Sequence, residues 1–278
     1  MINIVVAYAK NRVIGNKGRI PWKIKGEQQR FKELTTGNVV IMGRRSYEEI
    51  ERPLPNRTTI VISASKNFDA ENCMTAKSLD EALIMAEGKD IYISGGARLY
   101  EEALPLADKM YITEIDLEVE GDTYFPEFDE ELFEKEINQY FEGDIPYTYV
   151  TYTRKFTLCG DNCLCCPRYL AKTDEALQKA AELWHKAGWR DHVVSNEEIK
   201  CTGTGCSSHK QCTYQLVDCI KEHKVDKCNQ CPDYPCEKIC SMLRRSDLYK
   251  AKCLDVCIEE EYRLLESALF RKEENLRK

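Results

Sequence analysis

The cysteines of this chain are distributed unevenly, and their distribution divides the sequence into two parts. Only Cys73 lies before residue 159, whereas the other fourteen of the 15 cysteines lie between residues 159 and 278. A chain of 278 residues is long enough for one large domain or two modest ones. The change in composition predicts two domains, over residues 1–157 and 158–278.

Net charge and hydropathy indicate which kind of ligand the protein binds and where in the cell it acts. A net charge of -7 and a pI near 5.4 argue against nucleic acid as the partner and favour small ligands. No apolar run approaches the roughly 20 residues that a membrane helix needs, and Met1 leads into a strand-like segment without a charged leader. We therefore expect a cytoplasmic protein without membrane contact, whose clustered cysteines hold metal rather than disulfides.

Short apolar, β-branched runs alternate with helical patterns in the first part. The expected strands are residues 4–8, 39–42, 59–62 and 91–93, and the expected helices are residues 24–34, 45–50, 79–86 and 98–104. This alternation predicts an α/β fold with a mostly parallel sheet and helices on both faces. Three further strands, residues 109–115, 133–141 and 147–156, follow without helices between them and predict an antiparallel end to the sheet.

One carboxylate lies on the apolar side of the first expected helix. Ile24, Phe31 and Leu34 are at helical spacing around Glu27, which should therefore point away from water. With no obvious cation partner, a carboxylate so placed is expected to bind the ring N–H and amino group of an amidine-like ligand. The alternative is a rotated or frayed helix that leaves Glu27 in water.

Two strand-to-helix junctions have the composition of phosphate sites. The first is Gly43-Arg44-Arg45-Ser46, where free backbone N–H groups at a helix start favour anions. The second is Gly95-Gly96-Ala97-Arg98, where adjacent glycines allow a diphosphate to approach the backbone. Together they indicate a dinucleotide, although each alone is also found in ordinary packing or on a solvated face.

The order and spacing of several motifs resemble the dihydrofolate reductase family over residues 1–157. The motifs are Val13-Ile14-Gly15, Pro21-Trp22 with Glu27 and Phe31, Ile41-Met42-Gly43-Arg44, Arg52-Pro53-Leu54-Pro55, Gly95-Gly96 and Glu120-Gly121-Asp122-Thr123-Tyr124-Phe125-Pro126. The resemblance implies the family's mixed, mostly parallel sheet. It also implies NADPH-dependent reduction of 7,8-dihydrofolate to 5,6,7,8-tetrahydrofolate.

The same resemblance implies roles for individual residues. Catalysis would use Glu27 to bind the pterin and favour its protonation, Trp22 to hold a water, and Tyr100 to stabilise charge on the nicotinamide. The implied substrate-binding residues are Val5, Val6, Ala7, Glu27, Gln28, Phe31, Ile50, Leu54, Arg57, Ser94, Tyr100 and Thr113.

The implied cofactor site combines the two phosphate junctions with a lid. Arg44 and Ser63 would read the 2'-phosphate of NADPH, a cis peptide bond would join the glycine pair, and Asp122 would hold the lid of residues 15–22 shut. The implied cofactor-binding residues are Ala7, Ile14, Gly15, Ile20, Gly43, Arg44, Arg45, Ser46, Ser63, Ala64, Gly95, Gly96, Ala97, Arg98, Leu99 and Thr123.

Some positions depart from common bacterial members of the family. The acid is Glu27 instead of Asp, Gln28 and Ser94 replace apolar residues, and Ile20 stands where Met or Leu is common. We expect weaker inhibition by trimethoprim-type diaminopyrimidines, because a longer acid and a more polar wall should misfit them.

The second part is predicted to be mainly helical and metal-binding. Helices are expected over residues 173–187, 214–223, 235–243 and 248–270, with cysteine-bearing loops between them. Thiolate clusters prefer zinc or iron–sulfur centres. The alternative is that the thiols are buried without a metal. His192, His209 and His223 permit thiol or metal chemistry, and the alternative is that they are packed or exposed without such a role.

Residues 158–245 resemble a small cysteine-rich bacterial and archaeal family of no established function, with Gln215 where that family often has another cysteine. The candidate ligands are Cys159, Cys163, Cys166, Cys201, Cys206, Cys228, Cys231 and Cys236. Zinc is favoured over an iron–sulfur cluster because evenly spaced ferredoxin-type ligands are absent. A homodimer or a protein partner could use this domain.

Two other functions fit parts of the pattern. A ribosyl-pyrimidine reductase would share the sheet, although the segment from Trp22 to Glu27 argues against it. A folate- or nucleotide-responsive binding protein would keep the ligand site without turnover.

Overall fold

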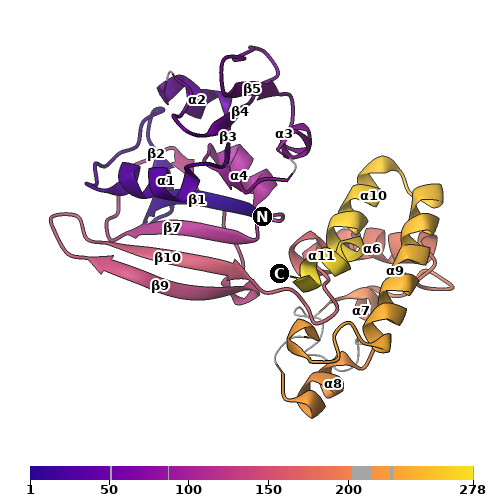
Figure 1. The fold of residues 1–278 in the computed structure, drawn as a ribbon. Coiled ribbons are helices and arrows are strands. Elements are labelled where there is room, and N and C mark those ends of the chain that lie inside the picture. The colour runs from indigo at the N-terminus through magenta and orange to yellow at the C-terminus, as the bar shows by residue number, and fades with distance from the viewer. Residues whose placement is uncertain (51, 87, 202–213, 226–227, 278) are drawn as a thin grey trace. The chain divides into compact units, whose positions relative to one another are not determined.

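The computed structural model describes residues 1–50, 52–86, 88–201, 214–225 and 228–277 (Figure 1). The chain divides into two compact units, Met1–Arg154 and Lys155–Lys278. Two cysteines, Cys206 and Cys212, lie outside the described residues, so the predicted ligand Cys206 has no structural description. No helix in the described ranges has the length and apolar character needed to cross a membrane.

The first unit alternates strands and helices as its sequence pattern predicts. Its elements are β1 (Ile2–Ala9), β2 (Val13–Gly15), α1 (Glu27–Thr35), β3 (Val39–Gly43), α2 (Arg44–Ile50), β4 (Thr58–Ile62), β5 (Cys73–Ala76), α3 (Leu79–Met85), β6 (Ile91–Ile93), α4 (Ala97–Ala103), β7 (Lys109–Ile115), β8 (Thr123–Tyr124), a 3-10 turn η1 (Glu130–Leu132), β9 (Phe133–Phe141) and β10 (Tyr147–Arg154).

Eight strands form one sheet in the order β5-β4-β3-β6-β1-β7-β10-β9 (Figure 1). The pairs from β5 to β7 are parallel, whereas β10 is antiparallel to both β7 and β9. The predicted mixed sheet with an antiparallel end is therefore confirmed. Its central strands are buried, including Ile4, Ile41 and Ile60, as expected for parallel strands covered on both faces.

The first helix begins later than its apolar pattern suggests. The sequence pattern places Ile24 in a helix over residues 24–34, but α1 starts at Glu27. Gly26 precedes it with φ of 104°, a left-handed conformation that glycine adopts readily and that stops the helix from extending backwards. Glu27 is therefore the first residue of the helix and not a residue of its middle.

The second unit is mainly helical. Its elements are η2 (Cys163–Cys165), α5 (Pro167–Leu170), α6 (Asp174–Lys186), α7 (Asn196–Ile199), α8 (Leu216–His223), η3 (Cys228–Gln230), α9 (Glu237–Val256), α10 (Glu259–Leu265), the π-helical segment η4 (Glu266–Phe270) and α11 (Lys272–Arg277).

The end of the chain differs from its predicted division. Helices over residues 235–243 and 248–270 were expected, but α9 continues through the predicted gap for 20 residues and the break comes at Cys257. Ser246 is buried within the predicted gap, and its hydroxyl donates to the carbonyl of Leu269. Packing against η4 therefore keeps this stretch helical although its charged sequence resembles a loop.

Candidate functional site

Glu27 is half-buried where α1 meets the end of β7. Its Oε1 accepts a hydrogen bond of 2.7 Å from the hydroxyl of Thr113, a buried residue of β7. Ala7 of β1 pairs with Thr113 in the parallel ladder, so this hydrogen bond ties the start of α1 to β7 next to β1. The carboxylate thus keeps one oxygen on the protein and can offer the other to a ligand.

Arg30 supplies a cation that the sequence pattern around Glu27 was not used to predict. Its Nη1 donates to the same Thr113 hydroxyl oxygen at 2.7 Å and to the carbonyl of Ile112 at 3.2 Å. The guanidinium lies over the ring of Tyr149, with 3.7 Å between its carbon and the ring centroid. Glu27 was expected to have no obvious cation partner, but Arg30, three residues along α1, shares its threonine and acts electrostatically on its carboxylate.

The environment of Glu27 acts on its pKa in both directions. Burial raises the pKa above its usual range, and the Thr113 hydrogen bond, the Arg30 charge and a Tyr149 hydrogen bond each lower it. Burial dominates, so the carboxyl takes up a proton at higher pH than an exposed glutamate does. A carboxyl whose pKa is raised beside a ligand site is a candidate for acid–base chemistry.

An apolar wall lies beside this carboxylate. Val5, Phe31 and Leu54 pack against one buried cluster that includes Val40 and Met42. Arg57 is buried behind it, where Nη1 donates to the hydroxyl of Thr35 at 3.1 Å and Nε donates to the carbonyl of Pro55 at 3.0 Å. These contacts fix a cation next to an apolar surface, which suits a flat ring carrying a carboxylate tail.

The glycine pair lies at the carboxyl ends of β3 and β6. The Gly95–Gly96 peptide bond is cis, and the carbonyl of Gly95 accepts from the N–H of Gly43 at 2.7 Å. A Cβ atom at Gly95 would lie 3.4 Å from the hydroxyl oxygens of both Ser46 and Tyr100, so the backbone passes close to both side chains. This edge combines the two predicted phosphate junctions into one place.

Tyr100 is buried below the glycine pair. Its hydroxyl donates to the carbonyl of Val5 at 2.8 Å, and burial raises its pKa, which keeps the phenol neutral. Trp22 is also buried and packs with Val13 and Ile115 in a cluster to which Ala7 contributes. Both predicted aromatic residues therefore belong to the layer that adjoins β1.

A mixed charge cluster lies where the 2'-phosphate was expected. Arg44 is 3.7 Å from Glu48, and the Lys66 ammonium approaches the same carboxylate at 2.5 Å. Ser63 is buried, and its hydroxyl accepts from the backbone N–H groups of Ser65 and Lys66. Ser63 thus shapes the turn that carries Lys66, a cation absent from the predicted site.

The expected lid and its holding loop are joined by strand pairing. β2 pairs antiparallel with β8, and the Asp122 carboxylate accepts from the backbone N–H of Lys17 at 2.9 Å. That hydrogen bond lowers the pKa of Asp122. A Cβ at Gly121 would lie 2.2 Å from Cγ1 of Val13 and 2.7 Å from the carbonyl oxygen of Gly15, so only glycine fits there.

Other predicted residues lie at the rim or on the surface. Arg98 points along α4, with its Nε 3.0 Å from Glu102, and is 92% exposed. The exposed residues among those predicted to bind ligands are Ile20, Gln28, Arg45, Ile50, Ala64 and Arg98. Residues 5–7 of β1 and residues 43–46, 94–97, 99–100 and 113 lie on the strands and junctions described above.

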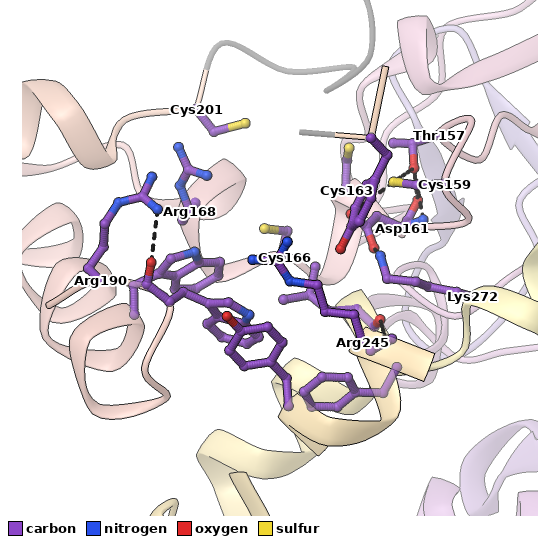
Figure 2. A pocket seen from close by; sticks show the side chains of 17 residues that line it. Thr157, Cys159, Asp161, Cys163, Cys166, Arg168, Arg190, Cys201, Arg245 and Lys272 are labelled. Carbon is purple, nitrogen blue, oxygen red and sulfur yellow. Dashed lines mark hydrogen bonds and ion pairs between the residues drawn. The ribbon is translucent and has the colours of Figure 1, made fainter. Parts of the chain in front are cut away.

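Two separate hollows in the second unit are lined by thiols. The first holds Cys159, Cys163, Cys166 and Cys201 (Figure 2). The second holds Cys219, Cys228, Cys231, Cys236 and His223. The predicted ligands in the described ranges therefore fall into two groups, and Cys219 and His223 join the second without having been predicted.

The two parts of the chain match two families. Residues 1–154 match the family described as dihydrofolate reductase, and residues 155–241 match one described as a protein of unknown function (DUF3795). The dihydrofolate reductase type A13 of Escherichia coli is 40% identical over 156 residues, which cover 55% of this chain and 94% of that relative. The dihydrofolate reductase of Bacillus subtilis is 40% identical over 131 residues, covering 47% of this chain and 78% of the relative.

A solved structure agrees with the sequence matches. The dihydrofolate reductase from Enterococcus faecalis, complexed with NADP(H) and RAB-propyl, superimposes with a TM-score of 0.52 at 34% identity, over 56% of this chain and 96% of that one. The alternating sheet, the Glu27–Thr113 pair and the cis glycine pair lie within the matched range. Through residues 1–154, this chain belongs to the dihydrofolate reductase family.

Proposed function

We propose that residues 1–154 reduce 7,8-dihydrofolate to 5,6,7,8-tetrahydrofolate with NADPH as the reductant. The observation that carries this proposal is the half-buried Glu27 carboxylate, held by Thr113 beside an apolar wall and across β1 from the glycine pair that follows β6. NADPH supplies the hydride when it is bound. The protein's own groups bind the pterin, orient it and control one proton.

Glu27 is the proposed pterin anchor. One oxygen is held by Thr113, and the carboxylate accepts from the pterin's amino and ring N–H groups. Its burial strengthens these bonds, and its negative charge favours protonation of the pterin nitrogen that receives the proton. Phe31 and Leu54 hold the rings, and Arg57 pairs with a carboxylate of the glutamate tail.

Arg44 and Lys66 are the proposed readers of the 2'-phosphate. Both cations share Glu48, so a phosphate arriving there would replace a carboxylate partner with a more highly charged one. Lys66 should therefore contribute to the choice of NADPH over NADH together with Arg44. The test compares the KM of Lys66→Ala for the two cofactors, and an unchanged ratio would exclude Lys66 from this role.

The reductase proposal is tested by following NADPH absorbance with dihydrofolate in the full-length chain. Wild-type protein should turn over, and Glu27→Gln should lose most of kcat/KM because it removes the charged acceptor. Glu33→Gln is the matched control, since Glu33 is an exposed residue of the same helix. No turnover by the wild type would leave the binding-protein alternative, and reduction of a ribosyl-pyrimidine instead would identify the related reductase.

For the second unit we propose a structural zinc ion bound by His223, Cys228, Cys231 and Cys236. These residues line one hollow of about 20 Å³, enough for a single small occupant. The ring Nδ1–H of His223 donates to the carbonyl of Cys219 at 2.9 Å, leaving Nε2 as the ligand atom. Ligand atoms of His223, Cys231 and Asp233 already lie within 4.8 Å of one another.

The local backbone supports a chelating turn at this hollow. The N–H of Cys231 donates to the carbonyl of Cys228 at 3.1 Å, and Cys236 stands immediately before α9. Cys228 and Cys236 line the same hollow as His223 and Cys231. Three thiolates and one imidazole are a common set for structural zinc.

Zinc content per chain tests this site. Purified wild-type protein should contain about one zinc, and His223→Ala and Cys231→Ser should lose it, whereas Cys219→Ser should keep it. Loss of zinc in Cys219→Ser but not in His223→Ala would assign four sulfur ligands instead. Zinc-free protein of unchanged thermal stability would refute the structural ion.

We further propose that the chain acts in the cytoplasm and that the second unit is where a second copy or a protein partner would bind. A thiol-rich metal unit is compatible with a reducing compartment. Cell fractionation tests the first point. Molecular mass in solution tests self-association, and a monomer at all working concentrations would exclude the dimer.

A further inference from the structure

A cavity of about 260 Å³ lies within the second unit and is the larger of the two thiol-lined hollows described above (Figure 2). Four cysteines line it: Cys159, Cys163 and Cys166 come from the segment that opens the unit, and Cys201 follows α7. Figure 2 shows the sulfur atoms of Cys163, Cys166 and Cys201 on different sides of the open space. Residues from two distant parts of the sequence thus converge on one cavity.

Three of the four cysteines in the segment that opens the second unit line the cavity. Cys165 does not line it and is buried elsewhere, where its sulfur accepts from the side-chain amide of Asn162 at 3.3 Å. The selected cysteines have the spacing Cys-x3-Cys-x2-Cys, and Cys201 is the fourth. A set of four thiols on one cavity is the ligand number of an iron–sulfur cluster.

The size of the cavity argues against a single ion. A space of 260 Å³ is about thirteen times the 20 Å³ hollow assigned to zinc. Sulfurs around one tetrahedral zinc lie about 3.8 Å apart, from a Zn–S distance of about 2.3 Å. Among the described residues, no three potential metal ligands that include one of these cysteines have their ligand atoms within 4.8 Å of one another. The four sulfurs therefore surround a space larger than a single ion.

The charges around the cavity favour an anionic occupant. Arg168, Arg190 and Arg245 line it, and none of the three forms an ion pair with a described carboxylate. Arg168 donates to the carbonyl of Ile199, and Arg190 to the carbonyl of Trp189. Four thiolates around a cluster carry a net negative charge, which these guanidinium groups would balance.

Contacts within the protein hold the loop that carries Cys159 and Cys163. Asp161 forms an ion pair with the buried ammonium of Lys272 from α11. The side-chain amide of Asn275 donates to the carbonyl of Gly160, and the N–H of Asn162 donates to the carbonyl of Ala268. Contacts with the last helices therefore fix the loop that carries Cys159 and Cys163, as a preorganised site requires.

We propose that Cys159, Cys163, Cys166 and Cys201 bind an iron–sulfur cluster in this cavity, separate from the zinc site. The assignment deepens the proposal that thiolates of the second unit bind metal and divides the predicted ligands between two kinds of centre. The aromatic residues Trp184, Trp189 and Phe270 on the cavity wall would shield the cluster from water.

The test is anaerobic reconstitution of the full-length chain with ferrous iron and sulfide. We expect bound iron and acid-labile sulfide in equal amounts, a brown colour, and a paramagnetic signal after reduction. Cys163→Ser, Cys166→Ser and Cys201→Ser should each lose most of the bound iron and sulfide. Cys165→Ser is the matched control from the same segment and should keep the full amount, and reductase activity should be unchanged in every variant.

Several results would overturn the cluster. Equal loss in Cys165→Ser and Cys166→Ser would show a general folding effect, which circular dichroism of the variants would reveal. Zinc bound by these four cysteines with no uptake of sulfide, or binding of inorganic phosphate without iron, would assign the cavity to another ligand. One zinc at the His223 site without a cluster would refute this inference alone, and a chain that binds neither metal would refute both proposals.

Discussion

Replacing Thr113 by valine tests how the site sets the protonation of Glu27. The Thr113 hydroxyl donates to the Glu27 carboxylate and accepts from Arg30, each at 2.7 Å. Valine keeps the shape of threonine but removes the bridge between them. Because the lost hydrogen bond stabilises the charged carboxylate, the pKa of Glu27 should rise further above its already raised value.

The size of this shift follows from the bond that is lost. A hydrogen bond to a charged group contributes about 1.5–3 kcal/mol, and one pKa unit corresponds to about 1.36 kcal/mol. The pKa of Glu27 should therefore rise by about 1–2 units in Thr113→Val. Substrate binding to the carboxylate is lost as pH falls through that pKa, so the acidic limb of the profile moves to higher pH.

The assay is kcat/KM for dihydrofolate as a function of pH at saturating NADPH. Thr113→Val should show the displaced acidic limb and approach wild-type values at high pH, whereas Thr113→Ser should retain the wild-type midpoint because it keeps the hydroxyl. An identical midpoint in the valine variant and the wild type would refute the role of this hydrogen bond. A uniform loss at all pH values would show misplacement of α1 instead.

Three further substitutions test the rest of the first unit. Gly121→Ala should raise the KM for NADPH and lower the free energy of unfolding by about 1–3 kcal/mol, because its Cβ would overlap Val13; combining it with Val13→Ala should restore part of the loss, and no recovery would contradict the proposed contact. Ser94→Ala should stabilise the ligand-free protein by about 1 kcal/mol in thermal melts, because the buried hydroxyl oxygen lacks a partner among the described residues; a lower melting temperature would reveal a partner. Glu27→Gln should raise the melting temperature at pH 7, because the pKa of Glu27 is higher in the folded protein than in the unfolded chain. The protonated carboxyl contributes its full stability below the unfolded pKa of about 4.3, and this contribution is lost as pH rises through the folded pKa. The gain over wild type should vanish below pH of about 4, and a gain independent of pH would exclude the charge as its cause.

The sheet was predictable because its signal is local and repeated. Each buried parallel strand, such as β3 or β4, is a short β-branched run, and each lies between helical patterns of ordinary length. Loop-borne features were harder to place. The start of α1 depends on the left-handed conformation of Gly26. The apolar Ile24 at helical spacing wrongly suggests that the helix begins earlier.

Only part of the environment of Glu27 could be predicted from the sequence pattern. The acid itself was predictable from its place among apolar residues, and Arg30 at i+3 was a signal that could have been used. Tyr149 could not be found in that way, because it comes from β10 and reaches Arg30 only through the antiparallel end of the sheet. Contacts across such a sequence distance depend on strand order, which composition does not encode.

In the second unit, too, sequence spacing does not show which cysteines lie together. Neighbours in sequence separate in space, since Cys165 turns away from the cavity that Cys163 and Cys166 share. Distant residues meet, since Cys201 joins them across α6 and α7. Counting thiols therefore leads to the prediction of metal binding, whereas the number and kind of the proposed centres depend on which thiols line the same hollow. A single Cys-to-Ser exchange inside one segment, at 165 or at 166, is consequently the sharpest discrimination between chance clustering and a built site.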